Sequence, residues 1–185
     1  MNDKYFLTDG VVGLRMVVED DLDGDYLNWL NDYETCLGNT HFRVPYSRQD
    51  LLNYIETTNA SKADYLFAVC KVDTGQHVGN IVLQNHNCID RSCSISFLLG
   101  VKSERGNSVM YRAGNLLLEH GFMRLNLHRI ACGTLSSNTA MIRLAGKFGM
   151  VKEGVRRDAV YKEGSYVDIV EFGLLKTDWI GRDFD

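Results

Sequence analysis

Runs of alternating or continuous apolar residues predict about seven β-strands in this chain. Two of the runs flank the turn Asp73-Thr74-Gly75, and two others flank Glu163-Gly164, so two β-hairpins are expected. The expected strands cover residues 11–18, 65–72, 77–84, 93–99, 128–135, 151–160 and 166–175.

Apolar residues spaced three and four apart predict the helices. Val109, Ala113 and Leu117 would lie on one face of a single helix. Ser47 and Asp50 have the spacing of a capping box, which opens another helix. The expected helices cover residues 26–30, 47–55, 108–124 and 138–148.

The order of these elements, β-α-α-β-β-β-α-β-α-β-β, predicts a mixed α/β sheet. Of the 185 residues, 45% are hydrophobic and 24% are charged, which is the balance of a soluble globular protein. No apolar run approaches the roughly 20 residues that span a bilayer, and residues 1–10 lack the basic start of a signal peptide. We therefore expect a single domain over residues 1–185 that is cytoplasmic and has no membrane partner.

The cysteines and histidines do not have the spacing of metal ligands. The five cysteines form no C-x-x-C pair, and Cys70, Cys93 and Cys132 lie in apolar runs where a reduced, buried thiol is expected. The five histidines show no ligand spacing either, so no metal site is predicted. Basic residues are not interleaved with stacking aromatic residues, so no nucleic-acid partner is expected.

Charge is distributed unevenly along the chain. The net charge is −4, but residues 1–60 carry eleven acidic and four basic residues, whereas residues 100–160 carry ten basic and four acidic ones. Two interpretations remain open. The two regions are separately solvated faces, or the second binds a polyanionic cofactor while the first attracts a cationic amine.

A polar loop joins the expected strand at 93–99 to the helix that follows it. It contains Arg105, Gly106, Asn107 and Ser108. Free backbone N–H groups and the positive end of the helix dipole converge at such a junction, which makes it a seat for a phosphate group. The loop therefore predicts a phosphate-bearing cofactor.

Several short motifs appear in a fixed order along the second half of the chain. They are Leu127-His128-Arg129-Ile130, Lys147-Phe148-Gly149-Met150, Glu153-Gly154-Val155-Arg156-Arg157 and Gly164-Ser165-Tyr166-Val167-Asp168. Through the order and spacing of these motifs the chain resembles the GNAT superfamily of acetyl-CoA-dependent N-acetyltransferases. Within that superfamily, the chain is similar to the branch that contains ribosomal-protein-alanine acetyltransferases and many antibiotic and amino-sugar acetyltransferases.

The resemblance implies a GNAT fold: a central, mixed, mostly antiparallel twisted sheet, flanked by helices and splayed at the strand that binds acetyl-CoA. Ser108 stands where the family's loop has Gly, and its hydroxyl is expected to cap the following helix. Met110 replaces a small residue where a phosphate approaches closely, so either a lower cofactor affinity or a different position of the loop is expected. The implied cofactor-binding residues are Leu98, Leu99, Gly100, Val101, Arg105, Gly106, Asn107, Ser108, Val109, Met110, Asn138 and Arg143.

The resemblance also suggests catalytic candidates. Asn138 would hydrogen-bond the cofactor near its pantetheine, and it can cap a helix at the same time. Met141 and Ala145 occupy the positions where relatives carry a Ser or Tyr that protonates the leaving thiolate. Tyr161, and with it Tyr166, is an alternative acid, although a strand tyrosine often serves packing alone.

His86 is the candidate base, together with Asp90 in the same turn, although a turn of this kind can also be merely solvated. Asp168 matches the family's Asp and can be purely structural.

Three functional hypotheses follow. The favoured one is transfer of an acetyl group from acetyl-CoA to the primary amine of a small molecule, such as a nucleotide-linked amino sugar, in a ternary complex. The second is acetylation of a protein N-terminus, for example on a ribosomal protein. The third is a protein that binds acyl-CoA but has impaired catalysis, as Met141 and Ala145 would suggest. A homodimer is a further possibility that the sequence does not decide.

Overall fold

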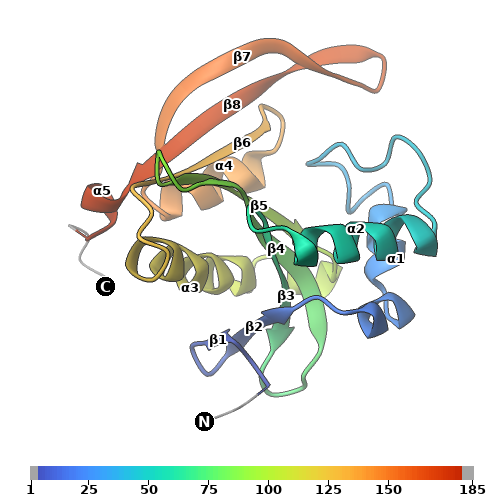
Figure 1. The fold of residues 1–185 in the computed structure, drawn as a ribbon. Helices are drawn as coiled ribbons and strands as arrows, with labels where there is room; N and C mark the ends of the chain where they lie inside the picture. The colour runs from blue at the N-terminus through green and yellow to red at the C-terminus, as the bar shows by residue number, and fades with distance from the viewer. Residues whose placement is uncertain (1–3, 181–185) are drawn as a thin grey trace.

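One eight-stranded sheet runs through residues 4–180, the part of the chain that the computed structural model describes (Figure 1). The strand order is β1-β2-β3-β4-β5-β6-β8-β7, and every neighbouring pair is antiparallel except β5 and β6. The expected mixed, mostly antiparallel sheet is thus confirmed. The strands are β1 (Leu7–Thr8), β2 (Val12–Met16), β3 (Tyr65–Lys71), β4 (His77–Asn87), β5 (Ser92–Leu99), β6 (Arg129–Leu135), β7 (Val151–Lys162) and β8 (Ser165–Leu175).

Helices cover both faces of the sheet (Figure 1). Helices α3 and α4 pack on one face, and α1 and α2 pack on the other. β1, two 3₁₀ helices and α5 are additional to the prediction, because elements of two to five residues are too short to show a period. No helix within residues 4–180 has the length and apolar character needed to cross a membrane. The helices are η1 (Glu19–Asp23), α1 (Tyr26–Leu30), α2 (Arg48–Ala60), η2 (Lys102–Glu104), α3 (Val109–Met123), α4 (Thr139–Lys147) and α5 (Lys176–Ile180).

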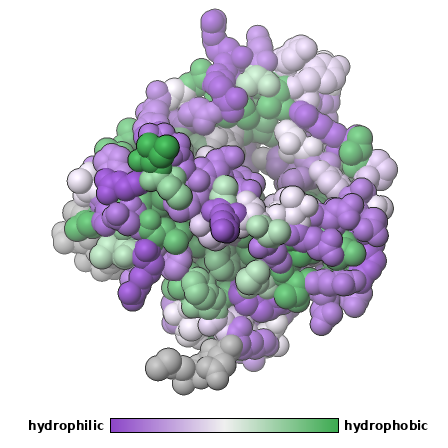
Figure 2. All heavy atoms as spheres, in the orientation of Figure 1, coloured by the Kyte–Doolittle hydropathy of each residue, from purple (hydrophilic) through white to green (hydrophobic). Residues whose placement is uncertain are grey.

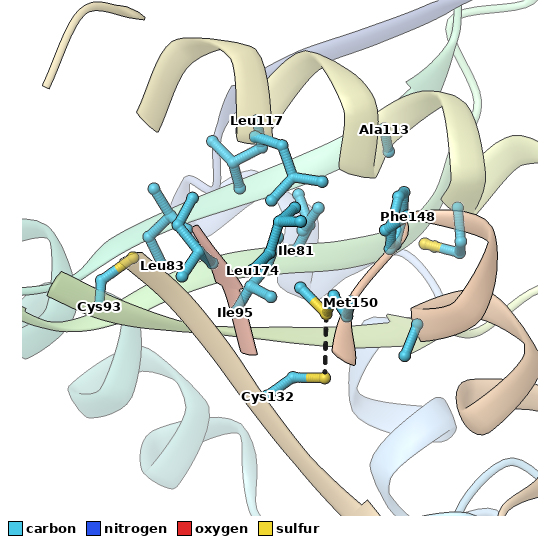
Figure 3. Close-up of a cluster of buried hydrophobic side chains, with 14 of the residues drawn as sticks. Ile81, Leu83, Cys93, Ile95, Ala113, Leu117, Cys132, Phe148, Met150 and Leu174 are labelled. Atoms are coloured by element: carbon cyan, nitrogen blue, oxygen red, sulfur yellow. Dashed lines mark hydrogen bonds between the residues drawn. The ribbon is translucent and has the colours of Figure 1, made fainter. Parts of the chain in front are cut away.

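The larger hydrophobic core lies between the sheet and helix α3 (Figure 3). Cys70, Cys93 and Cys132 are buried, as their apolar surroundings predicted. Burial raises the pKa of the Cys93 and Cys132 thiols to about 12, so both remain protonated. The Cys132 thiol points to the sulfur of Met150 at 3.5 Å.

The smaller core lies on the opposite face, beneath α1 and α2. Its Trp29 lies flat against Gly100, just after the end of β5. A Cβ atom at Gly100 would come within 1.9 Å of the Trp29 indole, so only glycine fits there. Helix α1 is thereby docked directly on the segment where β5 ends.

Two of the sequence motifs meet in the sheet. Arg129 at the start of β6 and Glu153 in β7 form an ion pair. They cross above Gly173 of β8, where an added Cβ would lie 2.4 Å from the Glu153 carboxylate. These motif residues therefore stabilise the order of strands β6, β8 and β7.

Strands β5 and β6 diverge along their length. Their parallel pairing extends only from Ser92↔Arg129 to Ser94↔Ala131, although β5 continues to Leu99 and β6 to Leu135. The expected splay is therefore present. Beyond Ser94, backbone N–H and C=O groups on this side of β5 have no strand partner among residues 4–180, and such groups need another hydrogen-bonding partner when they are buried. Figure 2 shows a hollow between the part that carries hairpin β7–β8 and the part that carries α2.

Candidate active site

Two cavities lie on opposite sides of the open end of β5. One, the α3–α4 groove, has a volume of 380 Å³ and is bordered by β5, the loop before α3, and α4. The other, the α1–α2 pocket, has a volume of 420 Å³ and is bordered by α1, α2, β4 and β5. Leu99 borders the groove, Ser96 and Leu98 border the pocket, and Phe97 borders both. Alternation of side chains along one strand thus separates two compartments that meet at the splay.

The open edge of β5 has identifiable donors and acceptors. The N–H groups of Gly100 and Val101 both donate to the Val78 carbonyl, at 3.0 and 3.1 Å. Hydrogen-bonding direction alternates along an antiparallel strand. The backbone groups of Leu98 therefore also face β4, and those of Phe97 and Leu99 face the open side. The sequence assigned residues 98–101 to the cofactor. Within that segment, Leu99 is the residue whose backbone N–H points to the open side and not to β4.

The loop before α3 has the backbone of an anion-binding turn. Gly106 has φ of +86° and Ser108 has φ of +60°. This left-handed conformation explains why relatives place Gly where this chain has Ser108. Ser108 is the N-cap residue of α3, but its side chain makes no capping hydrogen bond, so the expected cap is wrong. The Ser108 hydroxyl therefore accepts no hydrogen bond from the first turn of α3. The backbone N–H groups of that turn border the groove and can donate to an anion bound there.

The side chain of Met110 lies in the large core. Met110 is only 8% exposed, and its terminal methyl lies 2.4 Å from where a Cβ at Gly79 would be, so the side chain packs against β4. Met110 also borders the groove, and its effect on cofactor affinity stays a prediction.

Replacing Ser108 by glycine is expected to stabilise the protein by about 0.5–1 kcal/mol. Removing the cost of a left-handed serine, about 1–2 kcal/mol, outweighs the added entropy of an unfolded glycine. Urea unfolding measures the change. Ser103→Gly in η2, at an ordinary φ, is the matched control and should destabilise by about 0.5–1 kcal/mol. Equal effects of the two substitutions would contradict the assignment of strain to position 108.

Acidic side chains neutralise the basic residues around this loop. Glu34 accepts hydrogen bonds from Arg105 at 2.6 Å and Lys102 at 2.8 Å, and both lower its pKa. Glu104 is buried and accepts from Asn107 and Lys71, each at 3.1 Å, which lowers its pKa too. The acidic first region and the basic second region are therefore partly paired, and Arg105 must leave Glu34 to reach a phosphate.

Asn138 occupies the start of α4 and borders the α3–α4 groove. Its Oδ1 accepts from the Met141 N–H at 3.1 Å, so it caps the helix as predicted. Its Nδ2 donates to the Gly38 carbonyl at 2.9 Å, which joins α4 to the α1–α2 loop. Arg143 is exposed along the same groove, and Lys147, which the sequence did not single out, lies one helical turn further.

The remaining catalytic candidates lie elsewhere. Tyr161 is 56% exposed, stacks edge-on with Tyr166 at 5.3 Å, and borders a separate cavity beside the loop over residues 33–43. His86 approaches the Tyr65 hydroxyl at 3.0 Å. Among residues 4–180, neither Tyr161 nor His86 lines the α3–α4 groove or the α1–α2 pocket.

The carboxylates considered beside them are engaged in local structure. Asp90 accepts from Asn87 Nδ2 at 2.7 Å within its own turn. Asp168 accepts from the Asp158 N–H at 2.9 Å and so supports the left-handed backbone of Asp158.

The α1–α2 pocket contains polar residues that sequence reasoning missed. His41 lies 3.2 Å from the Tyr46 hydroxyl, and crowding by protein atoms lowers the pKa of His41. Asn80 is 5% exposed in the middle of β4. A lone amide within the run 78–83, which is otherwise apolar or glycine, was the available signal for it.

The family comparison agrees with this geometry. The acetyltransferase (GNAT) domain family matches residues 12–151. The chain therefore belongs to the GNAT acetyltransferase family, a class of enzymes that use acetyl-CoA. Residues 4–180 contain the splayed strand and the loop at the start of a helix, where the phosphate and amide groups of acetyl-CoA would find backbone partners.

Named relatives are N-acetyltransferases, and solved structures share the fold. A Bacillus licheniformis N-acetyltransferase called p20 is 27% identical over 136 residues, which cover 72% of this chain and 74% of p20. YdaF of Bacillus subtilis, named as a ribosomal N-acetyltransferase, is 29% identical over 108 residues, and the match spans 58% of each chain. The Vibrio cholerae spermidine N-acetyltransferase in complex with CoA and spermine shares the fold, with a TM-score of 0.83, 22% identity, and coverage of 94% of this chain and 100% of that one.

Proposed function

We propose that this protein transfers the acetyl group of acetyl-CoA to the primary amine of a small hydroxylated molecule, such as a free or nucleotide-linked amino sugar. The observation that carries the proposal is the open end of β5, with one cavity on each side. A cofactor in the α3–α4 groove and an amine in the α1–α2 pocket would meet at Phe97 without either crossing the sheet. This arrangement favours direct transfer in a ternary complex.

Residues at the splay and in the α1–α2 pocket fit two requirements of the reaction, a donor for the developing oxyanion and a base for the amine. Acetyl-CoA supplies an activated acyl group as a thioester. The Leu99 N–H faces the open side, where it can donate to the oxygen that becomes negative during transfer. His41, whose pKa is lowered, is neutral near pH 7 and can take the proton that the amine loses as the new C–N bond forms. The C–S bond breaks, the thiolate takes a proton from water, and His41 releases the proton from the amine to solvent.

The lining of the α1–α2 pocket favours a hydroxylated acceptor. Hydroxyl and amide groups of Tyr46, Tyr54, Asn80, Gln84 and Ser96 border it. Asp50 is its only carboxylate among residues 4–180, and that carboxylate is engaged in the capping box with Ser47. A polyamine with several positive charges would need more than one free carboxylate. A sugar ring would instead use the hydroxyls, the amides and the aromatic faces.

A protein N-terminus is the second candidate acceptor. The relation to YdaF supports it, and so do three exposed apolar side chains on the α1–α2 loop, Leu37, Phe42 and Val44. Such a patch can bind a peptide.

Acetyl-CoA is expected to raise the thermal stability of the protein. A ligand at one hundred times its Kd adds about 2.7 kcal/mol, which shifts Tm by several degrees. The next measurement is CoA release with glucosamine, a nucleotide-linked amino sugar, spermidine and N-terminal peptides. No thermal shift at millimolar acetyl-CoA would overturn the proposal. A shift without release on any amine would establish the alternative of an acyl-CoA-binding protein with impaired catalysis.

Self-association is proposed separately. The Vibrio cholerae spermidine N-acetyltransferase is described as dodecameric, and a homodimer is our expectation for this chain. Light scattering at several concentrations tests it, and a constant monomer mass would reject it.

A further inference from the structure

A chain of polar contacts runs from the edge of the sheet to the α1–α2 pocket. Arg15 donates to both oxygens of Asp21, at 2.6 and 2.8 Å. The His77 Nδ1 lies 3.3 Å from the Asp21 carboxylate, and the His77 Nε2 lies 2.9 Å from Asn80 Oδ1. Asp21, His77 and Asn80 have little exposure, since the side chains of Asp21 and His77 are 6% and 13% exposed and Asn80 is 5% exposed.

Both ring nitrogens of His77 face hydrogen-bond acceptors. The Nε2 also lies 3.0 Å from the Gly79 carbonyl, which can only accept. Nε2 must therefore carry a proton. The imidazole packs edge-on against the Trp29 ring, at a centroid distance of 5.0 Å, and against the Tyr26 ring at 6.0 Å, and these contacts help to hold its orientation.

This protonation fixes the side-chain amide of Asn80. Its oxygen must accept from the Nε2–H of His77, because turning the amide round would set NH₂ against N–H. The NH₂ group is then directed away from His77. Nδ2 is buried and has no hydrogen-bond partner among residues 4–180, and Asn80 borders the α1–α2 pocket. A buried donor without a partner costs about 1–3 kcal/mol, a cost that a bound ligand oxygen would remove.

We propose that Asn80 recognises the amine substrate by donating a hydrogen bond to one of its hydroxyl or carbonyl oxygens, and that His77, Asp21 and Arg15 are positioning residues for that amide. The inference rests on the proposed function and deepens it. Asn80 is directly opposite Leu98 in the β4–β5 register, beside the end of the strand that separates groove and pocket. An oxygen held there would lie close to the amine that enters the splay. Acceptors with a neighbouring hydroxyl would thus be selected over plain alkyl polyamines.

Asn80→Asp tests the donor, because it keeps the size of the side chain and replaces NH₂ by a second acceptor. We expect kcat/KM for glucosamine to fall at least about tenfold, mainly through KM, while the KM for acetyl-CoA is unchanged. Activity on spermidine relative to glucosamine should rise. Asn53→Asp on the exposed face of α2 is the matched control, with the same change of charge and no expected effect. Identical acceptor kinetics for the two variants would overturn the proposal.

Two substitutions of His77 test the positioning role. His77→Phe keeps a ring but removes the Nε2–H donor, so the Asn80 amide is free to turn and the KM for the acceptor should rise. His77→Gln retains an N–H₂ group that can reach the Asn80 oxygen and should recover most of the wild-type KM. A purely structural role for His77 would give equal acceptor KM values in the two variants.

A measurement without turnover separates this inference from the proposed function. In ¹⁵N-labelled protein, the Nε2 of His77 should carry a proton, and glucosamine should shift the Asn80 side-chain NH₂ resonances. An Nε2 without a proton would overturn the orientation of Asn80, and so would unshifted NH₂ resonances at saturating glucosamine. If no amine is acetylated, the proposed function fails, and the nitrogen resonances still decide the state of His77.

Discussion

Replacing Phe148 by alanine is expected to lower the free energy of unfolding by about 3–5 kcal/mol, the largest effect of any substitution considered. Phe148 is fully buried at the end of α4. Its ring stacks on Tyr111 of α3 at 5.5 Å and on Phe97 of β5 at 5.7 Å. It also fills the space above Gly114, where a Cβ would lie 2.1 Å from the ring. Removing the ring would leave a cavity between α3, α4 and β5, and these three elements cannot all move inward to fill it.

The same substitution should weaken acetyl-CoA binding, because Phe97 and Tyr111 both border the α3–α4 groove. Urea unfolding measures the stability, and calorimetric titration measures the affinity. Phe148→Leu is the matched control, since it keeps an apolar side chain and should lose less stability. A loss below about 1 kcal/mol for Phe148→Ala would contradict the role assigned to the ring.

Asp21→Asn is expected to destabilise the protein by about 3 kcal/mol, because removing one partner of a buried ion pair leaves the other charge uncompensated. Asp21 accepts from Arg15, His77 and the Val18 N–H, and it is the only carboxylate in residues 4–180 shown to contact His77. Asp20→Asn, at the exposed neighbouring position, should change stability by less than about 0.5 kcal/mol. Similar losses of stability in the Asp21→Asn and Asp20→Asn variants would contradict the stabilising role assigned to the buried Asp21 ion pair.

Lowering the pH should reduce the difference in the free energy of unfolding between the wild-type protein and the Asp21→Asn variant. Burial alone would raise the pKa of Asp21, but hydrogen bonds from Arg15 and His77 outweigh it and lower the pKa. A lowered folded-state pKa contributes stability that is complete above the unfolded value of about 3.9 and is lost as pH falls from there toward the folded value. Urea midpoints of the two proteins should therefore converge below pH ~4. A constant difference between pH 7 and pH 3 would contradict this assignment.

Local patterns in the sequence determined most of the secondary structure. Periods of two and of three to four reflect which face of an element is buried, so every strand but the two-residue β1 was expected near its observed position, as were helices α3 and α4. Helix α2 was expected from its capping box, but it continues five residues beyond the expected end, to Ala60. Capping was equally local, because Ser47 and Asn138 accept from the N–H groups three residues ahead. The family motifs predicted the splay, since they fix which strands are neighbours.

The contacts that define the candidate site were decided by the tertiary structure. The hydrophobic pattern shows that Asn80 interrupts a buried strand face. It does not show that His77, which Asp21 holds in place, orients the Asn80 amide. Arg105 was correctly placed in the loop, yet its partner Glu34 is 71 residues away in the sequence. Met110 turned into the core, and Tyr161 and His86 lie away from both cavities. Such pairings depend on how the helices dock on the sheet, which follows from packing the whole core and leaves no local pattern in the sequence.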